Sequence, residues 1–151
     1  TLGVNFLYSK QLDFDLFLLA IGIGLLSVAV LNLNNMRDEA SDRKSGKNTI
    51  VVQMGGEKAK KYHYFLIITA MVVFVVFALL NNFNIDQYLF LVAYYPLVKH
   101  LDTVKKNTNP KELDPELKKV ALSTFLLSVL FSLCMIYFFS DVIVNTFMGG
   151  R

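Results

Sequence analysis

Cysteine and histidine are scarce in this sequence, and their scarcity excludes several kinds of site. Cys134 is the only cysteine, so no internal disulfide can form, and its place inside an apolar run favours a role in packing. The two histidines are His63 and His100. No cysteine or carboxylate stands at zinc-ligand spacing from either of them, and no Ser-His-Asp arrangement is evident. A zinc enzyme and a serine hydrolase are therefore both disfavoured.

Charge is also missing from three long stretches, and this absence indicates the broad class of the protein. Residues 16–36, 62–85 and 120–140 contain no aspartate, glutamate, lysine or arginine. Each stretch reaches the roughly 20 residues that a helix needs to cross a hydrocarbon core of about 30 Å. With 54% apolar residues and a mean hydropathy of +0.47, the chain is too apolar for an ordinary soluble domain. Because its apolar residues do not alternate with period two, a barrel is disfavoured, and the predicted fold is an all-α bundle of transmembrane helices.

A fourth segment, residues 83–101, is a weaker candidate for a span because it contains Asp86 and Pro96. Two interpretations stay open: a spanning helix with a kink at Pro96, which frees backbone carbonyls toward neighbouring helices, or a re-entrant or interfacial helix. Gly22 and Gly24 in the first span are expected to permit close helix approach. The sequence thus predicts one membrane domain over residues 1–151, with about four spans at residues 14–36, 62–81, 83–101 and 117–140.

The distribution of basic residues predicts the topology. Of the 15 lysines and arginines, seven lie in residues 37–61 and six in residues 99–119. If all four segments span, these two loops fall on the same side of the membrane, and the positive-inside rule places both in the cytoplasm. The net charge of +3 could suggest a nucleic-acid partner, but the concentration of basic residues in these two loops argues against one. The predicted location is a bacterial inner membrane, which the chain crosses several times. Both histidines are expected at the cytoplasmic interface.

The polar stretch that follows the first span carries the candidate chemistry. If the first helix continues past Met36, then Asn34, Asp38 and Asp42 share one stripe at positions i, i+4 and i+8. Two carboxylates one turn apart repel each other unless a cation lies between them. Mg²⁺ suits such a pair, because it takes one or two carboxylates and completes its shell with water and substrate phosphates. Asp38 and Asp42 are therefore the predicted metal-binding and catalytic residues.

Basic and amide side chains beside this stripe suit a diphosphate, since a guanidinium grips phosphate through two hydrogen bonds and an ammonium acts as a point charge. The alternative is a solvated loop whose charges merely pair locally, although amide groups so close to an apolar run favour a cavity or a partner. The run from Gly46 to Thr49 is not a phosphate-binding loop, because it lacks the upstream glycine and a preceding strand. The predicted diphosphate-binding residues are Asn34, Asn35, Arg37, Arg43, Lys44 and Lys47.

Residues 34–49 resemble the second Asp-rich motif of the UbiA superfamily of intramembrane prenyltransferases, and most of all its 1,4-dihydroxy-2-naphthoate polyprenyltransferase branch. That motif has the form N-N-x-R-D-x-x-x-D-x-x-x-G-K-x-T, and the segment from Asn109 to Leu122 is similar in pattern to the loop and last helix of the family. The residues that match the motif are Asn34, Asn35, Arg37, Asp38, Asp42, Gly46, Lys47 and Thr49.

The resemblance implies an enzyme that transfers a polyprenyl group from an allylic diphosphate to an aromatic acceptor in menaquinone synthesis, with Mg²⁺ as cofactor. It also implies an incomplete site, because the family's first Asp-rich motif has no counterpart here. The chain would correspond to the C-terminal half of a member, some four of roughly nine helices, with the N-terminal half as its missing partner. Alone it is expected to be inactive.

Two other functions fit these residues less well. A subunit for cation transport would use an acidic pair, but Asp38 and Asp42 lie at the end of the first span rather than deep inside it. A non-catalytic membrane scaffold would leave the motif at residues 34–49 unexplained. The prenyltransferase is the interpretation that uses all of these residues.

Overall fold

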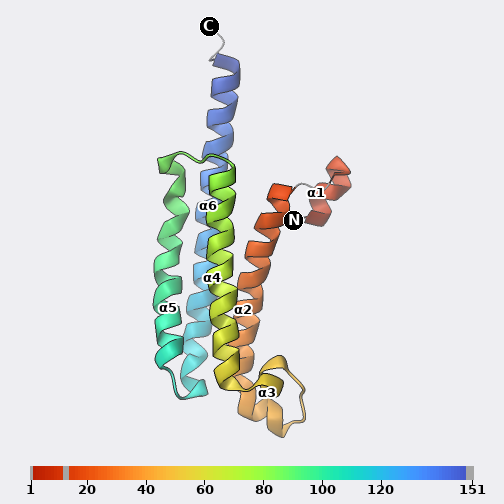
Figure 1. The fold of residues 1–151 in the computed structure, drawn as a ribbon, viewed down its shortest axis with the longest axis vertical. Helices are drawn as coiled ribbons and strands as arrows, with labels where there is room; N and C mark the ends of the chain where they lie inside the picture. The colour runs from red at the N-terminus through yellow and green to blue at the C-terminus, as the bar shows by residue number, and fades with distance from the viewer. Residues whose placement is uncertain (1, 12–13, 149–151) are drawn as a thin grey trace.

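Every element of the computed structural model is helical over the part of the chain that it describes, residues 2–11 and 14–148 (Figure 1). These residues contain no strand, which confirms the predicted all-α fold. The elements in chain order are α1 (Leu2–Ser9), α2 (Phe14–Lys44), α3 (Ile50–Met54), α4 (Gly56–Leu80), the 3₁₀ helix η1 (Ile85–Ala93), α5 (Tyr94–Lys106), the 3₁₀ helix η2 (Pro110–Leu113) and α6 (Asp114–Met148).

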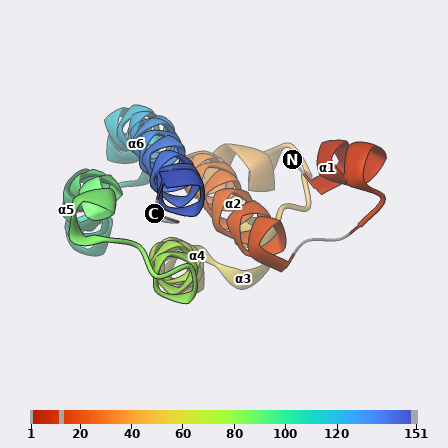
Figure 2. The ribbon, with the colours of Figure 1, turned by 90° about the horizontal axis from the view of Figure 1, so that it is seen from above.

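The long helices form a bundle in which α2, α4, α5 and α6 run side by side (Figure 1) and occupy the corners of a four-sided cross-section when seen from above (Figure 2). Helix α2 packs mainly against α4, while α6 packs against η1, α5 and α2. Among the described residues, three helical segments are long and apolar enough to cross a membrane: Phe14–Lys44, Gly56–Leu80 and Pro110–Phe138. They overlap the first, second and fourth predicted spans.

The third predicted span is built differently from the other three. It consists of η1 followed by α5, and its irregular residue is Tyr88, whose φ of −88° and ψ of 15° interrupt the helical geometry. Pro96 instead lies in the first turn of α5, where a missing N–H breaks no helical hydrogen bond. Of the two interpretations left open, the spanning helix with a kink at Pro96 therefore needs its irregular residue moved to Tyr88, and whether this segment spans stays a prediction.

Aromatic rings from α4, η1 and α6 fill the core of the bundle. The Phe131 ring centroid lies 5.0 Å from that of Phe74, 5.4 Å from that of Phe77 and 5.2 Å from that of Phe90. A Cβ atom on Gly22 would stand only 2.8 Å from Cε2 of Phe74, so glycine is what lets α2 approach α4 here. A Cβ on Gly24 would meet nothing within 4 Å. The prediction of close approach is confirmed for Gly22 and wrong for Gly24.

A second apolar cluster fixes the end of the bundle that carries the polar motif. Leu33 and Met36 of α2 pack there with Val51 of α3, Leu113 of η2 and Val120 of α6. The α2–α4 and α5–α6 connections, which hold the two basic loops, lie at this same end, whereas α4 joins η1 at the opposite end (Figure 1). The two loops therefore share one side of the bundle, as the charge pattern requires; its assignment to the cytoplasm stays a prediction.

The two histidines meet inside the bundle. The side chains of His63 and His100 are 0% and 1% exposed, and their Nε2 atoms are 2.8 Å apart. Nδ1 of His100 is 2.7 Å from Oε2 of Glu116, whose other oxygen pairs with Lys119. This buried chain of polar groups links α4, α5 and α6. It was not expected, because 37 residues separate the two histidines in the sequence.

Candidate functional site

The first helix continues without interruption past the apolar run to Lys44, so the stripe of Asn34, Asp38 and Asp42 forms as predicted. A compact turn then ends the helix. The N–H of Lys47 donates to the carbonyl of Asp42 at 2.9 Å, and the N–H of Gly46 donates to the carbonyl of Arg43 at 3.4 Å. Gly46 adopts a φ of +73°, a conformation in which glycine carries no steric penalty. The turn folds the chain after α2 back over its last carboxylate.

Arg37 is the centre of the site's hydrogen bonds. Its Nε and Nη2 donate to the two carboxylate oxygens of Asp38, both at 2.9 Å. Nη2 also donates to Oδ1 of Asn34 at 3.0 Å, and Nη1 donates to Oδ1 of Asp114 at 2.7 Å. This planar guanidinium thus joins three acceptors in a fixed geometry. Three predicted residues come together here, and Asp114 joins them from the start of α6.

Asp42 lies one turn further along and has its own cation. Only 5% of this residue is exposed, and Nζ of Lys47 donates to its Oδ1 at 3.0 Å. The hydrogen bond that Lys47 donates to Asp42 raises the pKa of this lysine, which keeps its ammonium charged. The lysine side chain is 67% exposed, so it lies between the buried carboxylate and solvent. The sequence predicted Asp42 and Lys47 as two residues of one site, but it did not predict that they contact each other directly.

The remaining predicted residues do not join this cluster. Arg43 donates to Glu39 at 3.0 Å and to the carbonyl of Val52 at 3.3 Å, so its guanidinium is held toward α3. Lys44 is exposed at the last position of α2. Asn35 is half-buried and lies about 100° around the helix from Asn34, off the stripe.

A groove of about 560 Å³ opens between the end of α2 and η2. Arg37, Asp38 and Ser41 line one wall, and Asn109 and Lys111 lie on the other. The Asn109 side chain accepts from the backbone N–H of Lys111 at 3.3 Å, which starts η2. The groove therefore combines two carboxylates, those of Asp38 and Asp114, with a guanidinium and an ammonium, a set of charges suited to a phosphate-bearing ligand that binds together with a divalent cation.

Sequence reasoning missed the opposite wall of this groove, together with Asp114. The contact between Arg37 and Asp114 joins residues 77 positions apart. The sequence does contain two patterns typical of a helix start, Asn109-Pro110 and Asp114-Pro115, and they indicate where η2 and α6 begin. Those patterns predict where a helix begins but not what its first turn faces.

The residues fit a divalent cation only as part of a ligand set. No group of three or more histidine, cysteine, aspartate or glutamate side chains that could hold a metal occurs among the described residues. Asp38, Asp42 and the amide oxygen of Asn34 nevertheless form one stripe of hard oxygen ligands at successive turns of α2. Mg²⁺ is commonly held by one or two carboxylates together with water and substrate phosphates, so this donor set suits it.

Comparison with known proteins identifies the family of this chain. The profile of the UbiA prenyltransferase family matches residues 2–114. The chain is 39% identical over 131 residues to 1,4-dihydroxy-2-naphthoate octaprenyltransferase of Haemophilus influenzae and 37% identical over 132 residues to the enzyme of that name from Escherichia coli. Each match covers 87% of this chain, but only 42% and 43%, respectively, of the relative.

No solved structure matches the chain significantly. The chain spans less than half the length of the curated relatives it matches. The family match, together with three helices long and apolar enough to cross a membrane, makes it part of a multi-pass membrane protein, and the resemblance seen at residues 34–49 is confirmed at the level of the family. The chain belongs to the UbiA prenyltransferase family.

Proposed function

We propose that the protein containing this chain transfers a polyprenyl group from an allylic polyprenyl diphosphate to 1,4-dihydroxy-2-naphthoate, giving demethylmenaquinol. The observation that carries the proposal is the stripe of Asn34, Asp38 and Asp42 beside Arg37, at the wall of a groove that also holds Lys111. The relatives supply the reaction class, since both are named as octaprenyltransferases acting on this naphthoate. The length of the prenyl chain is not part of the proposal.

In this proposal the diphosphate lies in the groove between α2 and η2. Arg37 pairs with Asp38 and lines the groove together with Lys111, while Lys47 pairs with Asp42 one turn further along α2. Asp38 and Asp42 are the residues that would hold Mg²⁺, which when bound would neutralise the charge that develops on the departing diphosphate. Because Arg37 is already hydrogen-bonded to Asn34, Asp38 and Asp114, little reorganisation is needed when the charge appears.

The bond changes follow from the substrates. The allylic C–O bond breaks and its electron pair leaves with the diphosphate, while the prenyl carbon forms a bond to an electron-rich carbon of the naphthoate ring. That ring carbon is the one that bears the carboxylate. The carboxylate leaves as carbon dioxide, and the electron pair of its C–C bond to the ring restores the aromatic system. The apolar bundle shields the allylic cation from water. A substrate with a long isoprenoid tail also explains why the transferase is a membrane protein.

The chain matches less than half the length of each relative, so the proposal also concerns the half that is not matched. We infer that the matched portion is the C-terminal one and that the N-terminal half supplies the first Asp-rich motif and its share of the metal ligands. The motif of this chain provides two carboxylates, Asp38 and Asp42, and each is already paired with a basic side chain. A half-site of this kind can bind a diphosphate weakly, but it lacks the preorganised charges that ionise the allylic ester.

A reconstitution experiment tests the proposal. The 151-residue chain and the N-terminal half are expressed separately, purified in detergent and supplied with Mg²⁺, a polyprenyl diphosphate and 1,4-dihydroxy-2-naphthoate. We expect no prenylated product from this chain alone and measurable product once both halves are combined. Robust product from the chain alone would contradict the half-site. Failure of the complete protein to form product would refute the assigned reaction.

A further inference from the structure

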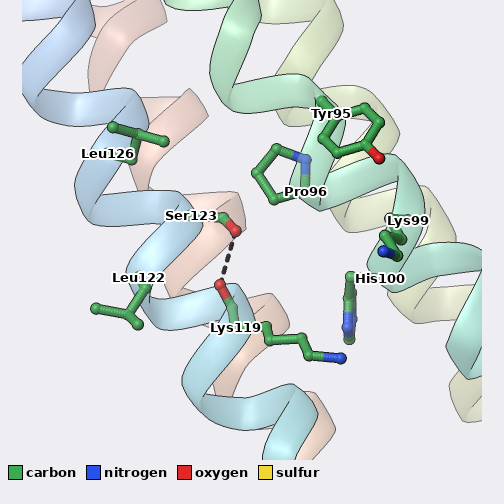
Figure 3. A pocket seen from close by; sticks show the side chains of 8 residues that line it. All are labelled: Tyr95, Pro96, Lys99, His100, Lys119, Leu122, Ser123 and Leu126. Atoms are coloured by element: carbon green, nitrogen blue, oxygen red, sulfur yellow. Dashed lines mark hydrogen bonds between the residues drawn. The ribbon is translucent and has the colours of Figure 1, made fainter.

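A groove between α5 and α6 lies outside the proposed catalytic site. It has a volume of about 330 Å³, and Figure 3 shows it between the two helices. Its lining falls into a basic end and an apolar end. The basic end holds Lys99 of α5 and Lys119 of α6, and the apolar end is formed by Tyr95, Pro96, Leu122 and Leu126.

The basic end carries more positive charge than its neighbours neutralise. Lys119 pairs with Glu116, but the carboxylate is 2% exposed while the lysine side chain is 57% exposed. Glu116 is also bound by His100 at 2.7 Å, so its negative charge is engaged inside the bundle. Lys99 is exposed, and in the described part of the chain no carboxylate pairs with it. Two exposed lysines therefore line the same end of the groove.

The apolar end continues onto a surface suited to hydrocarbon. Tyr95 is 73% exposed, Leu122 is 56% exposed and Leu126 is 38% exposed. Pro96 places its ring at the groove without loss of a helical hydrogen bond, because it lies in the first turn of α5. Two exposed leucines beside the two lysines match a ligand with an anionic head group and an apolar chain.

We propose that this groove binds one anionic phospholipid, with its phosphate between Lys99 and Lys119 and one acyl chain along Tyr95, Leu122 and Leu126. Basic pockets between transmembrane helices on the cytoplasmic side are suited to anionic lipid head groups. The basic end of this groove is formed by Lys99 of α5 and Lys119 of α6, the two helices that flank one of the basic loops. A free phosphate would use only the basic end. A packed protein helix would leave the two ammonium groups without anions.

The test compares lipids retained by the whole protein that contains this chain. The protein is purified in a neutral detergent and supplied with an equal mixture of phosphatidylglycerol and phosphatidylcholine with identical acyl chains, and the bound lipids are counted by native mass spectrometry. Each lysine near the head group should favour the anionic lipid by about fivefold, and the two together by about 25-fold. Glycerol phosphate, which lacks acyl chains, is the competitor that separates a lipid site from a phosphate site.

Matched variants assign the preference to the groove. Lys99→Gln should lower it about fivefold without touching an ion pair, and the double variant with Lys119→Gln should remove most of it. Lys118→Gln is the control, because this exposed lysine on the same helix does not line the groove. Leu126→Asn should weaken retention of both lipids at this site.

Three results would overturn the proposal. The first is a lipid preference that Lys99→Gln leaves unchanged, or that Lys118→Gln lowers equally. The second is displacement of the lipid by glycerol phosphate at equal concentration. The third is full retention of phosphatidylglycerol by Leu126→Asn.

Discussion

Replacing Gly22 with alanine should cost stability, whereas the same change at Gly24 should increase it. Both glycines lie in α2, and glycine to alanine inside a helix gains about 0.8–1 kcal/mol of intrinsic helix stability. A Cβ at Gly24 meets nothing within 4 Å, so this gain stands alone. A Cβ at Gly22 would lie 2.8, 3.2 and 3.3 Å from three atoms of the Phe74 ring. The ring cannot easily move, because Phe74 is 1% exposed and packs on Phe131.

The magnitude follows from comparing the two variants. Overpacking a filled core costs about 1–3 kcal/mol, and the helix-propensity gain is common to both changes. The free energy of unfolding of Gly24→Ala should therefore exceed that of Gly22→Ala by about 1–3 kcal/mol. In the Gly22→Ala background, Phe74→Leu should cost less than it does in the original protein, because the shorter side chain relieves the contact.

Unfolding of the purified protein in mixed micelles, followed by circular dichroism as the denaturing detergent increases, measures these differences. The double-mutant cycle between positions 22 and 74 supplies the coupling energy. Equal stability of the two alanine variants, or a coupling energy near zero, would show that α2 and α4 do not meet at Gly22. The register that places the motif at the end of α2 would then be wrong as well.

Three further outcomes are expected. Arg37→Lys should lower turnover by about 100-fold in a prenyl-transfer assay, because one ammonium cannot replace a guanidinium that meets three acceptors; turnover within a few-fold of normal would contradict its role. Glu116→Leu should lower the free energy of unfolding by about 1–3 kcal/mol, since it leaves a buried nitrogen of His100 without an acceptor, while Glu116→Gln should cost less; the reverse order, measured by the same detergent titration, would count against the buried network. Cysteines placed at Ser45 and Asn107 should react with an impermeant thiol reagent only from the cytoplasmic side, and labelling of either from outside intact cells would refute the topology.

Much of the bundle was predictable because the relevant signals are local. Charge-free stretches reveal long helices, and the four-residue spacing of Asn34, Asp38 and Asp42 places them on one face once the helix continues to Lys44. Close helix approach at Gly22 was also anticipated from the residue type, although the sequence did not indicate which helix approaches there. Each of these inferences needs only the chain within a few turns of the residue concerned.

The parts that escaped prediction depend on contacts between distant segments. Asp114 reaches Arg37 across 77 residues, and His63 reaches His100 across 37, with no periodic pattern to reveal either pair. The break at Tyr88 rather than at Pro96 shows a different limit. A proline bends a helix only when it lies in the helix interior. Here α5 begins at Tyr94, so Pro96 lies in the first turn, where its ring is tolerated.

The central claim is that Asp38 and Asp42 act on the diphosphate through a bound divalent cation. Its most direct test is the turnover of Asp38→Asn and Asp42→Asn in the complete protein as Mg²⁺ is titrated, with Asp102→Asn as the control. Asp102 is a carboxylate of α5 that pairs only with Lys106 in the described ion pairs, away from the groove at η2. We expect each motif variant to lose at least about 100-fold in turnover with an unchanged unfolding transition, and the control to keep normal activity. Near-normal turnover of either motif variant at saturating Mg²⁺ would contradict the assigned role of these carboxylates.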